Sequence, residues 1–167
     1  MGFGEAIKTC FSKYFTISGR ARRSEYWYFY LFTFILGIVA GIIDVALGLG
    51  GDIGLLGTIA SLATFIPTIT AQVRRLHDTG RSGWWVGGAL IAFIVFGVVI
   101  GATFGAIGVE DPSDMFAGTV GVLVIVFAIA VLIYSITMLV FMCLDSEPGT
   151  NKYGPSPKYD TGATVFD

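Results

Sequence analysis

Four long apolar runs constrain the fold of this chain more than any other feature of its sequence. They lie at about Trp27–Leu49, Ile53–Val73, Trp84–Val109 and Val120–Leu144, and the shortest has 21 residues. A helix of that length rises roughly 31 Å, which matches the hydrocarbon core of a bilayer. Transmembrane strands would need only about 9–11 residues of alternating polarity, and that alternation is absent. The runs predict an all-α integral membrane protein with four transmembrane helices.

The charge content excludes an ordinary soluble domain. Only 13% of the 167 residues are charged, against about 25% in a typical soluble domain. Within the four runs, Asp44 is the only aspartate, glutamate, lysine, arginine or histidine. The formal net charge of −2 indicates no particular partner. Apart from the arginines, nothing in the sequence supports nucleic-acid binding.

The basic residues predict the orientation. Five lysines and arginines precede the first run, three lie between the second and third, and two follow the fourth, which accounts for all 10. The other two connections contain none. Because positively charged loops remain in the cytoplasm, both termini are predicted to be cytoplasmic.

The sequence predicts three regions. Residues 1–25 form a cytoplasmic segment with an interfacial amphipathic helix, residues 26–145 contain the four spans, and residues 146–167 form an irregular or mobile cytoplasmic tail. Neither Cys10 nor Cys143 lies in a zinc-binding motif, so we expect free thiols, no metal and no cofactor. The predicted amphipathic helix carries an apolar stripe of Phe3, Ile7, Cys10, Phe11 and Tyr14, with Lys8 and Lys13 off that stripe.

Glycines at a spacing of four mark two of the predicted spans. Small residues at this spacing let helix backbones approach closely in a membrane. We interpret them mainly as packing positions within a four-helix bundle, with contact between copies of a homo-oligomer as the alternative. The candidate packing residues are Gly37 and Gly41 in the first span and Gly97, Gly101 and Gly105 in the third.

Two further residues inside the spans are candidates for function. An ionisable residue such as Asp44 is rare in a span and is often functional. Pro67 removes a backbone donor and is expected to bend its helix. Thr64, Thr68 and Thr70 are expected to satisfy the carbonyl that this proline leaves free. Together, Asp44 and the Pro67 kink support the alternative function of a small transporter or channel subunit.

Two polar stretches are predicted to lie on the cytoplasmic side. "VRRLHDTGRSGWW" separates the second and third runs, and "GRARRSEYW" precedes the first. As a simple turn, the former would pair Arg74 with Asp78 at i, i+4 and end its helix at Thr79–Gly80. As a binding surface, the two stretches would supply these contacts to a headgroup or partner: Gly19, Arg20, Arg22, Arg23, Glu25, Trp27, Arg74, Arg75, His77, Asp78, Gly80, Arg81, Trp84 and Trp85.

These stretches also carry a family resemblance. Together with the closing "GTNKYGPSP" at Gly149–Pro157, "GRARRSEYW" and "RRLHDTGRSGWW" resemble the DUF805 family over about Phe11 to Pro157. The resemblance implies a small bacterial inner-membrane protein with four spans. It implies no activity, substrate or cofactor. The acidic connection around Glu110–Asp114 is not part of the resemblance.

The favoured function is a non-catalytic membrane module. Six arginines facing Glu25 and Asp78 leave an excess of positive charge, which suits anionic lipid headgroups or an acidic segment of a membrane-protein partner. An enzyme using His77 and Asp78 is the remaining alternative. No nucleophile, set of metal ligands or phosphate-binding loop accompanies these two residues, which argues against catalysis.

Overall fold

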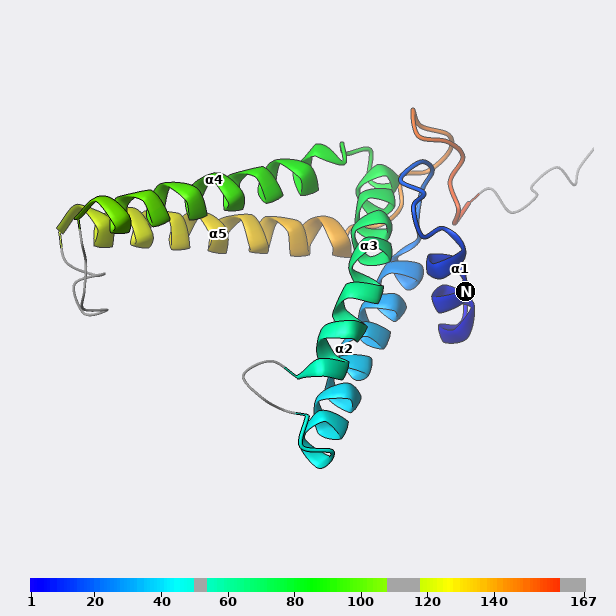
Figure 1. The fold of residues 1–167 in the computed structure, drawn as a ribbon. Coiled ribbons are helices and arrows are strands. Elements are labelled where there is room, and N and C mark those ends of the chain that lie inside the picture. The colour runs from blue at the N-terminus through cyan, green and yellow to red at the C-terminus, as the bar shows by residue number, and fades with distance from the viewer. Residues whose placement is uncertain (50–53, 108–117, 160–167) are drawn as a thin grey trace, which may run out of the picture. The chain divides into compact units, whose positions relative to one another are not determined.

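The computed structural model describes residues 1–49, 54–107 and 118–159. Four of its helices are long and apolar enough to cross a membrane, which confirms the prediction of an all-α protein with four transmembrane helices. In chain order, the helices are α1 (Phe3–Ser12), α2 (Arg23–Ala46), α3 (Leu55–Asp78), α4 (Trp84–Ile107) and α5 (Gly118–Cys143) (Figure 1).

The chain divides into two compact units. One comprises residues 1–83 together with residues 142–167, and the other comprises residues 84–141. The first unit therefore combines α1, α2 and α3 with the segment that follows α5. The second contains α4 and most of α5. The predicted boundary at residue 145 separates the fourth span from the cytoplasmic tail. The contacts described below join this tail to the first hairpin, which consists of α2 and α3.

Helix α3 continues five residues beyond its apolar run. Residues Arg74 to Asp78 are all buried, so their helical backbone is stabilised by side-chain partners rather than by lipid. The helix ends at Thr79, and Gly80 adopts a left-handed conformation with φ of +72°. Glycine tolerates this conformation without steric cost. The predicted stop at Thr79–Gly80 is confirmed.

Helix α1 packs its apolar stripe against α2. The Phe3 ring meets Tyr28 edge-on at 6.0 Å between centroids, and Phe11 makes similar contacts with Phe29 and Phe32. Cys10 is fully buried in the same cluster. The expected amphipathic helix is present, and it lies beside the first transmembrane hairpin in Figure 1. Its buried face is therefore occupied by protein.

The backbone carbonyl that lacks a helical donor because of Pro67 accepts a hydrogen bond from a residue outside α3. Pro67 has no N–H for the carbonyl of Ala63, four residues earlier. The hydroxyl of Tyr14 donates to that carbonyl at 3.0 Å. Thr64 and Thr68 donate instead to the carbonyls of Ala60 and Thr64. The expectation that neighbouring threonines satisfy the freed carbonyl was therefore wrong.

Helices α4 and α5 contact each other through aromatic rings. Phe127 lies face to face with Phe96, at 3.5 Å between centroids, and edge-on to Phe93. The hydroxyl of Tyr134 donates to the carbonyl of Trp85 at 2.8 Å. These large side chains connect the two helices, and Phe93, Phe127 and Tyr134 also line a pocket of about 160 Å³ between them.

The candidate packing glycines do not make close contacts within their units. A Cβ atom built on Gly37, Gly41, Gly97 or Gly101 would meet no heavy atom within 4 Å. None of the four is therefore a close-packing position within its own unit, and their role in packing a four-helix bundle stays a prediction. The side-chain surroundings of Gly105 lie outside what the structure describes. Contact between copies of the chain remains a prediction.

Candidate functional site

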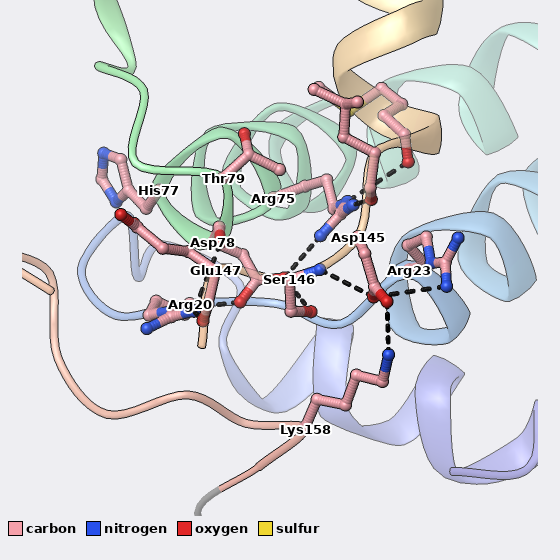
Figure 2. A network of polar contacts seen from close by, with 12 residues as sticks. Arg20, Arg23, Arg75, His77, Asp78, Thr79, Asp145, Ser146, Glu147 and Lys158 are labelled. Atoms are coloured by element: carbon pink, nitrogen blue, oxygen red, sulfur yellow. Dashed lines mark hydrogen bonds and ion pairs between the residues drawn. The ribbon is translucent and has the colours of Figure 1, made fainter. Parts of the chain in front are cut away.

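The polar stretches of the sequence come together in a single cluster at one end of the first hairpin. We call it the arginine cap, and it comprises residues 19–25, 74–81 and 145–156. The three stretches that carry the family resemblance thus contact one another in space. Figure 2 shows Asp78 between Arg20, Arg75 and Ser146, with Asp145 at the edge of the cluster.

Asp78 lies at the centre of the arginine cap. Its carboxylate is fully buried and accepts hydrogen bonds from Arg20 Nε at 3.0 Å, from Arg75 Nη1, and from the hydroxyl of Ser146. Its backbone carbonyl accepts the N–H of Glu147 at 2.9 Å. A buried carboxylate is stable only when such partners replace its lost hydration. Asp78 therefore joins α3 to both other parts of the cap.

Arg20 extends from the loop before α2 to the segment after α5. Besides its ion pair with Asp78, its guanidinium donates to the carbonyls of Gly149 at 2.8 Å and Gly154 at 3.2 Å, and to that of Glu147. The residue is only 6% exposed. Its donors are thus used within the protein.

Arg75 is equally enclosed. Its Nε donates to the carbonyl of Met142 at 3.2 Å, and Nη2 donates to the carbonyl of Leu144. These carbonyls belong to the last turn of α5 and the residue that follows it. The side chain of Arg75 is fully buried. It therefore holds the end of α5 against α3.

Arg74 pairs with a different acid from the one expected. Its Nη2 donates to Glu25 at 2.9 Å, and both side chains are buried. Its Nη1 donates to the carbonyls of Thr16 at 2.7 Å and Lys13 at 3.3 Å. The predicted i, i+4 pair of Arg74 with Asp78 was wrong, because Arg75 occupies the acid from the i, i+3 position. Arg74 instead fixes the loop between α1 and α2.

His77 is a packing residue in this arrangement. Its ring lies flat against Tyr153, with 3.7 Å between centroids and 4° between planes. Its Nδ1 lies 3.2 Å from the carbonyl of Gly19, which indicates a proton on that nitrogen. The backbone carbonyl of His77 accepts the side-chain amide of Asn151 at 3.0 Å. His77 is thereby held from both sides.

Sequence reasoning missed the contribution of the segment after α5. It was expected to be irregular or mobile. Its described residues, 144–159, form no helix or strand, but they pack on the cap through Ser146, Glu147, Asn151 and Tyr153. The signal that pointed to it was the match of "GTNKYGPSP" to the family pattern. An irregular segment with a specific sequence often has a tertiary contact to maintain.

The charge balance of the cap also differs from the prediction. The six arginines were expected to face only Glu25 and Asp78, but Asp145 and Glu147 belong to the same cluster. Three of the arginines are buried inside it. In this structure, the side chains of Arg20, Arg74 and Arg75, together with Glu25, His77 and Asp78, bind protein partners, and their contact with a headgroup stays a prediction. They stabilise the fold.

The remaining candidates lie nearer the surface. Arg23 is about half exposed and pairs with Asp145 at 3.3 Å. The ammonium of Lys158 binds the same carboxylate and holds the pKa of Asp145 below its usual range. Arg22 is partly exposed and makes no ion pair within the described ranges. Arg81 donates to the carbonyl of Thr79. The candidates Gly19, Trp27 and Gly80 are also partly exposed, and Trp84 and Trp85 are exposed.

Asp44 has a structural role at the opposite end of the first hairpin. It is only 2% exposed, and its two carboxylate oxygens accept the N–H groups of Leu56 and Gly57, each at 2.9 Å. These are donors of the first turn of α3, which its own N-cap residue, Gly54, leaves without a side-chain partner. Asp44 thus caps α3 from α2, where a carboxylate also suits the helix dipole.

Replacing Asp44 by alanine is expected to lower the stability of the first hairpin by about 0.5–2 kcal/mol, the usual effect of losing an N-cap. An asparagine side chain would keep one acceptor oxygen, so Asp44→Asn should be milder. Thermal unfolding of the detergent-solubilised protein measures both.

A Cβ at Gly54 would lie 2.5 Å from the Asp44 carboxylate. Gly54→Ala should therefore lower the stability of the native chain, and it should lower the stability of the Asp44→Ala protein less. If the stability losses of the two substitutions simply add, the result would contradict the capping role of Asp44.

The two cysteines are free and differ in their surroundings. Cys143 is exposed, whereas Cys10 is buried. Burial, with a smaller contribution from the nearby Glu25 and against the effect of Arg74, raises the pKa of Cys10 to about 12. Because the thiolate is the reactive form, Cys10 should be inert at neutral pH. Among the described residues, no group of three His, Cys, Asp or Glu side chains is arranged to hold a metal ion.

Comparison with known proteins supports the family resemblance that the three sequence stretches of the cap carry. The model of the family described as "Protein of unknown function (DUF805)" matches residues 14–155. The inner membrane protein YhaI of Escherichia coli K12 is 35% identical over 146 residues, which cover 87% of this chain and 89% of YhaI. The inner membrane protein YhaH of the same strain is 35% identical over 150 residues, or 88% and 91% of the two chains. No solved structure matches the chain.

Proposed function

The chain belongs to the DUF805 family of unknown function, and we propose that it is a non-catalytic module of the bacterial inner membrane that contacts anionic lipid headgroups. Its termini lie in the cytoplasm, on the side of all 10 lysines and arginines. The contact surface lies in residues 1–23, outside the buried centre of the arginine cap. The arginines buried in the cap keep this surface in place beside α2.

The observation that carries this proposal is the combination of exposed apolar and basic side chains in residues 1–23. Phe15 is 80% exposed and Ile17 is 58% exposed, in the loop that Arg74 fixes. Lys8 is exposed on α1, and Lys13 and Arg22 are partly exposed. Apolar side chains that enter the interface beside basic ones are typical of membrane-surface segments. Each basic residue near an anionic surface contributes about 1 kcal/mol.

The transporter alternative receives no support from a specific contact. Both oxygens of Asp44 are occupied by backbone N–H groups of α3, and the carbonyl freed by Pro67 is bound by Tyr14. These contacts favour a static kink and a capped helix. Neither residue offers a free group to a passing ion.

Reporter fusions test the orientation. Fusions at Ser82 and after the last residue should report the cytoplasm, because every basic connection lies on that side. Fusions at Gly51 and Ser113, which lie outside the described residues, should report the periplasm. A cytoplasmic signal at Gly51 would contradict the proposed topology.

Lipid retention tests the headgroup contact. The double variant Lys8→Gln/Lys13→Gln should retain phosphatidylglycerol and cardiolipin less well than the native protein, by about 5-fold for each lysine that lies near the surface. Native mass spectrometry of the detergent-purified protein measures the bound lipid. Lys152→Gln is the matched control, since it removes one positive charge from the segment after α5. Equal retention of anionic and neutral lipids by the native protein would overturn the proposal and favour a protein partner.

A further inference from the structure

We propose that Arg20, beside Arg75, forms a latent phosphate-binding site that residues 145–156 cover. We call these residues the latch. The ligand of the open site is a phosphate group, carried by a lipid headgroup or free in solution. The inference deepens the proposed function and rests on it, because it adds a second, covered headgroup site to the exposed one in residues 1–23.

The latch supplies several acceptors to the guanidinium of Arg20. The guanidinium of Arg20 donates to three backbone carbonyls of the latch, those of Glu147, Gly149 and Gly154. Several oxygens placed around one planar guanidinium are also what a phosphate group offers. The latch therefore occupies donors that are suited to a phosphate.

Arg20 and Arg75 carry more positive charge than their ion-pair partner balances. The two guanidinium groups share one carboxylate, that of Asp78. The carboxylate of Glu147 is directed to the side-chain amide of Asn151, at 2.8 Å. Among the described residues, no second carboxylate forms an ion pair with either guanidinium, and the half-exposed Asp145 acts on Arg75 only from beyond ion-pair distance. An anion in place of the latch would supply the missing negative charge, which carbonyl groups lack.

Few buried side chains hold the latch in place. Within it, only Ser146 and Ser156 are buried, and the hydroxyl of Ser156 has no hydrogen-bond partner. The latch contains no helix or strand, and Asn151 and Tyr153 make its side-chain contacts with His77. Segments with little buried apolar surface open at low free-energy cost. The latch can therefore separate from the rest of the cap while α2 and α3 stay folded.

The experiment loosens the latch in the full-length protein. Asn151→Ala/Tyr153→Ala removes both side-chain contacts with His77 and leaves every arginine in place. Phosphatidylglycerol retention from mixed bilayers with phosphatidylcholine should rise by about 5-fold, the effect of one uncompensated positive charge. Thr150→Ala, an exposed position in the same segment, is the matched control and should change nothing.

Two further measurements identify the site and the ligand. Phenylglyoxal should modify Arg20 in the loosened variant, and phosphatidylglycerol should protect it; this readout needs no arginine substitution. If inorganic phosphate protects Arg20 equally well, the site recognises free phosphate, and if only the lipid protects, it recognises a headgroup. Unchanged retention, or no protection of Arg20 by either ligand, would overturn the inference. The Lys8→Gln/Lys13→Gln result in the native chain would stand independently of that outcome.

Discussion

Asp78→Ala should destabilise the protein by about 3–5 kcal/mol, the cost of removing one partner from a buried ion pair. The alanine would leave the guanidinium groups of Arg20 and Arg75 buried without their shared carboxylate. It would also remove the acceptor of the Ser146 hydroxyl. We expect poor accumulation in membranes and a strongly lowered unfolding temperature in detergent.

Two variants sharpen this prediction. Asp78→Asn keeps the shape and one acceptor oxygen but removes the negative charge, so it should be harmful but less so than alanine. Asp145→Ala is the matched control, because it removes a carboxylate that pairs with Arg23 and Lys158 at about half-exposed positions. Exposed pairs contribute little because water screens them. Equal stability of the Asp78→Ala and Asp145→Ala proteins would refute the central role of Asp78.

Glu25→Ala is expected to have an effect of similar size, about 3–5 kcal/mol, because it leaves the fully buried Arg74 with only neutral carbonyl partners. Cys10 provides a local measurement. Its thiol is protected by burial in the native protein, and Cys143 is an exposed internal reference. In the Glu25→Ala protein, a maleimide should label Cys10 at neutral pH, whereas Arg22→Gln should leave Cys10 protected.

A double substitution separates charge from packing. Replacing a buried ion pair by apolar residues of similar volume is often nearly neutral. Glu25→Leu/Arg74→Met should therefore be more stable than Glu25→Ala alone. The carbonyls of Lys13 and Thr16 would still lose their donor. Hydrogen exchange should thus increase in residues 13–19 of the double variant; unchanged exchange there would show that Arg74 does not fix this loop.

The candidate site was only partly predictable from the sequence. The two arginine stretches were expected to lie together and to involve Glu25 and Asp78, and the structure brings them into contact through these two acids. The partners were not predictable, because the hydrogen bonds of Arg20 join residues more than 100 positions apart. An arginine is usually exposed, so nothing in its identity indicates that Arg74 and Arg75 are buried. The headgroup surface was therefore first assigned to residues that stabilise the fold.

What the sequence by itself determined is the number of membrane spans, their approximate positions and the family. These properties depend on local composition, because a bilayer accepts any uncharged apolar helix of sufficient length. Only the tertiary structure decided that Asp44 caps α3, that Tyr14 binds the carbonyl freed by Pro67, and that the segment after α5 closes over Arg20. In each case a buried polar group needs a partner, and its position depends on how distant segments pack.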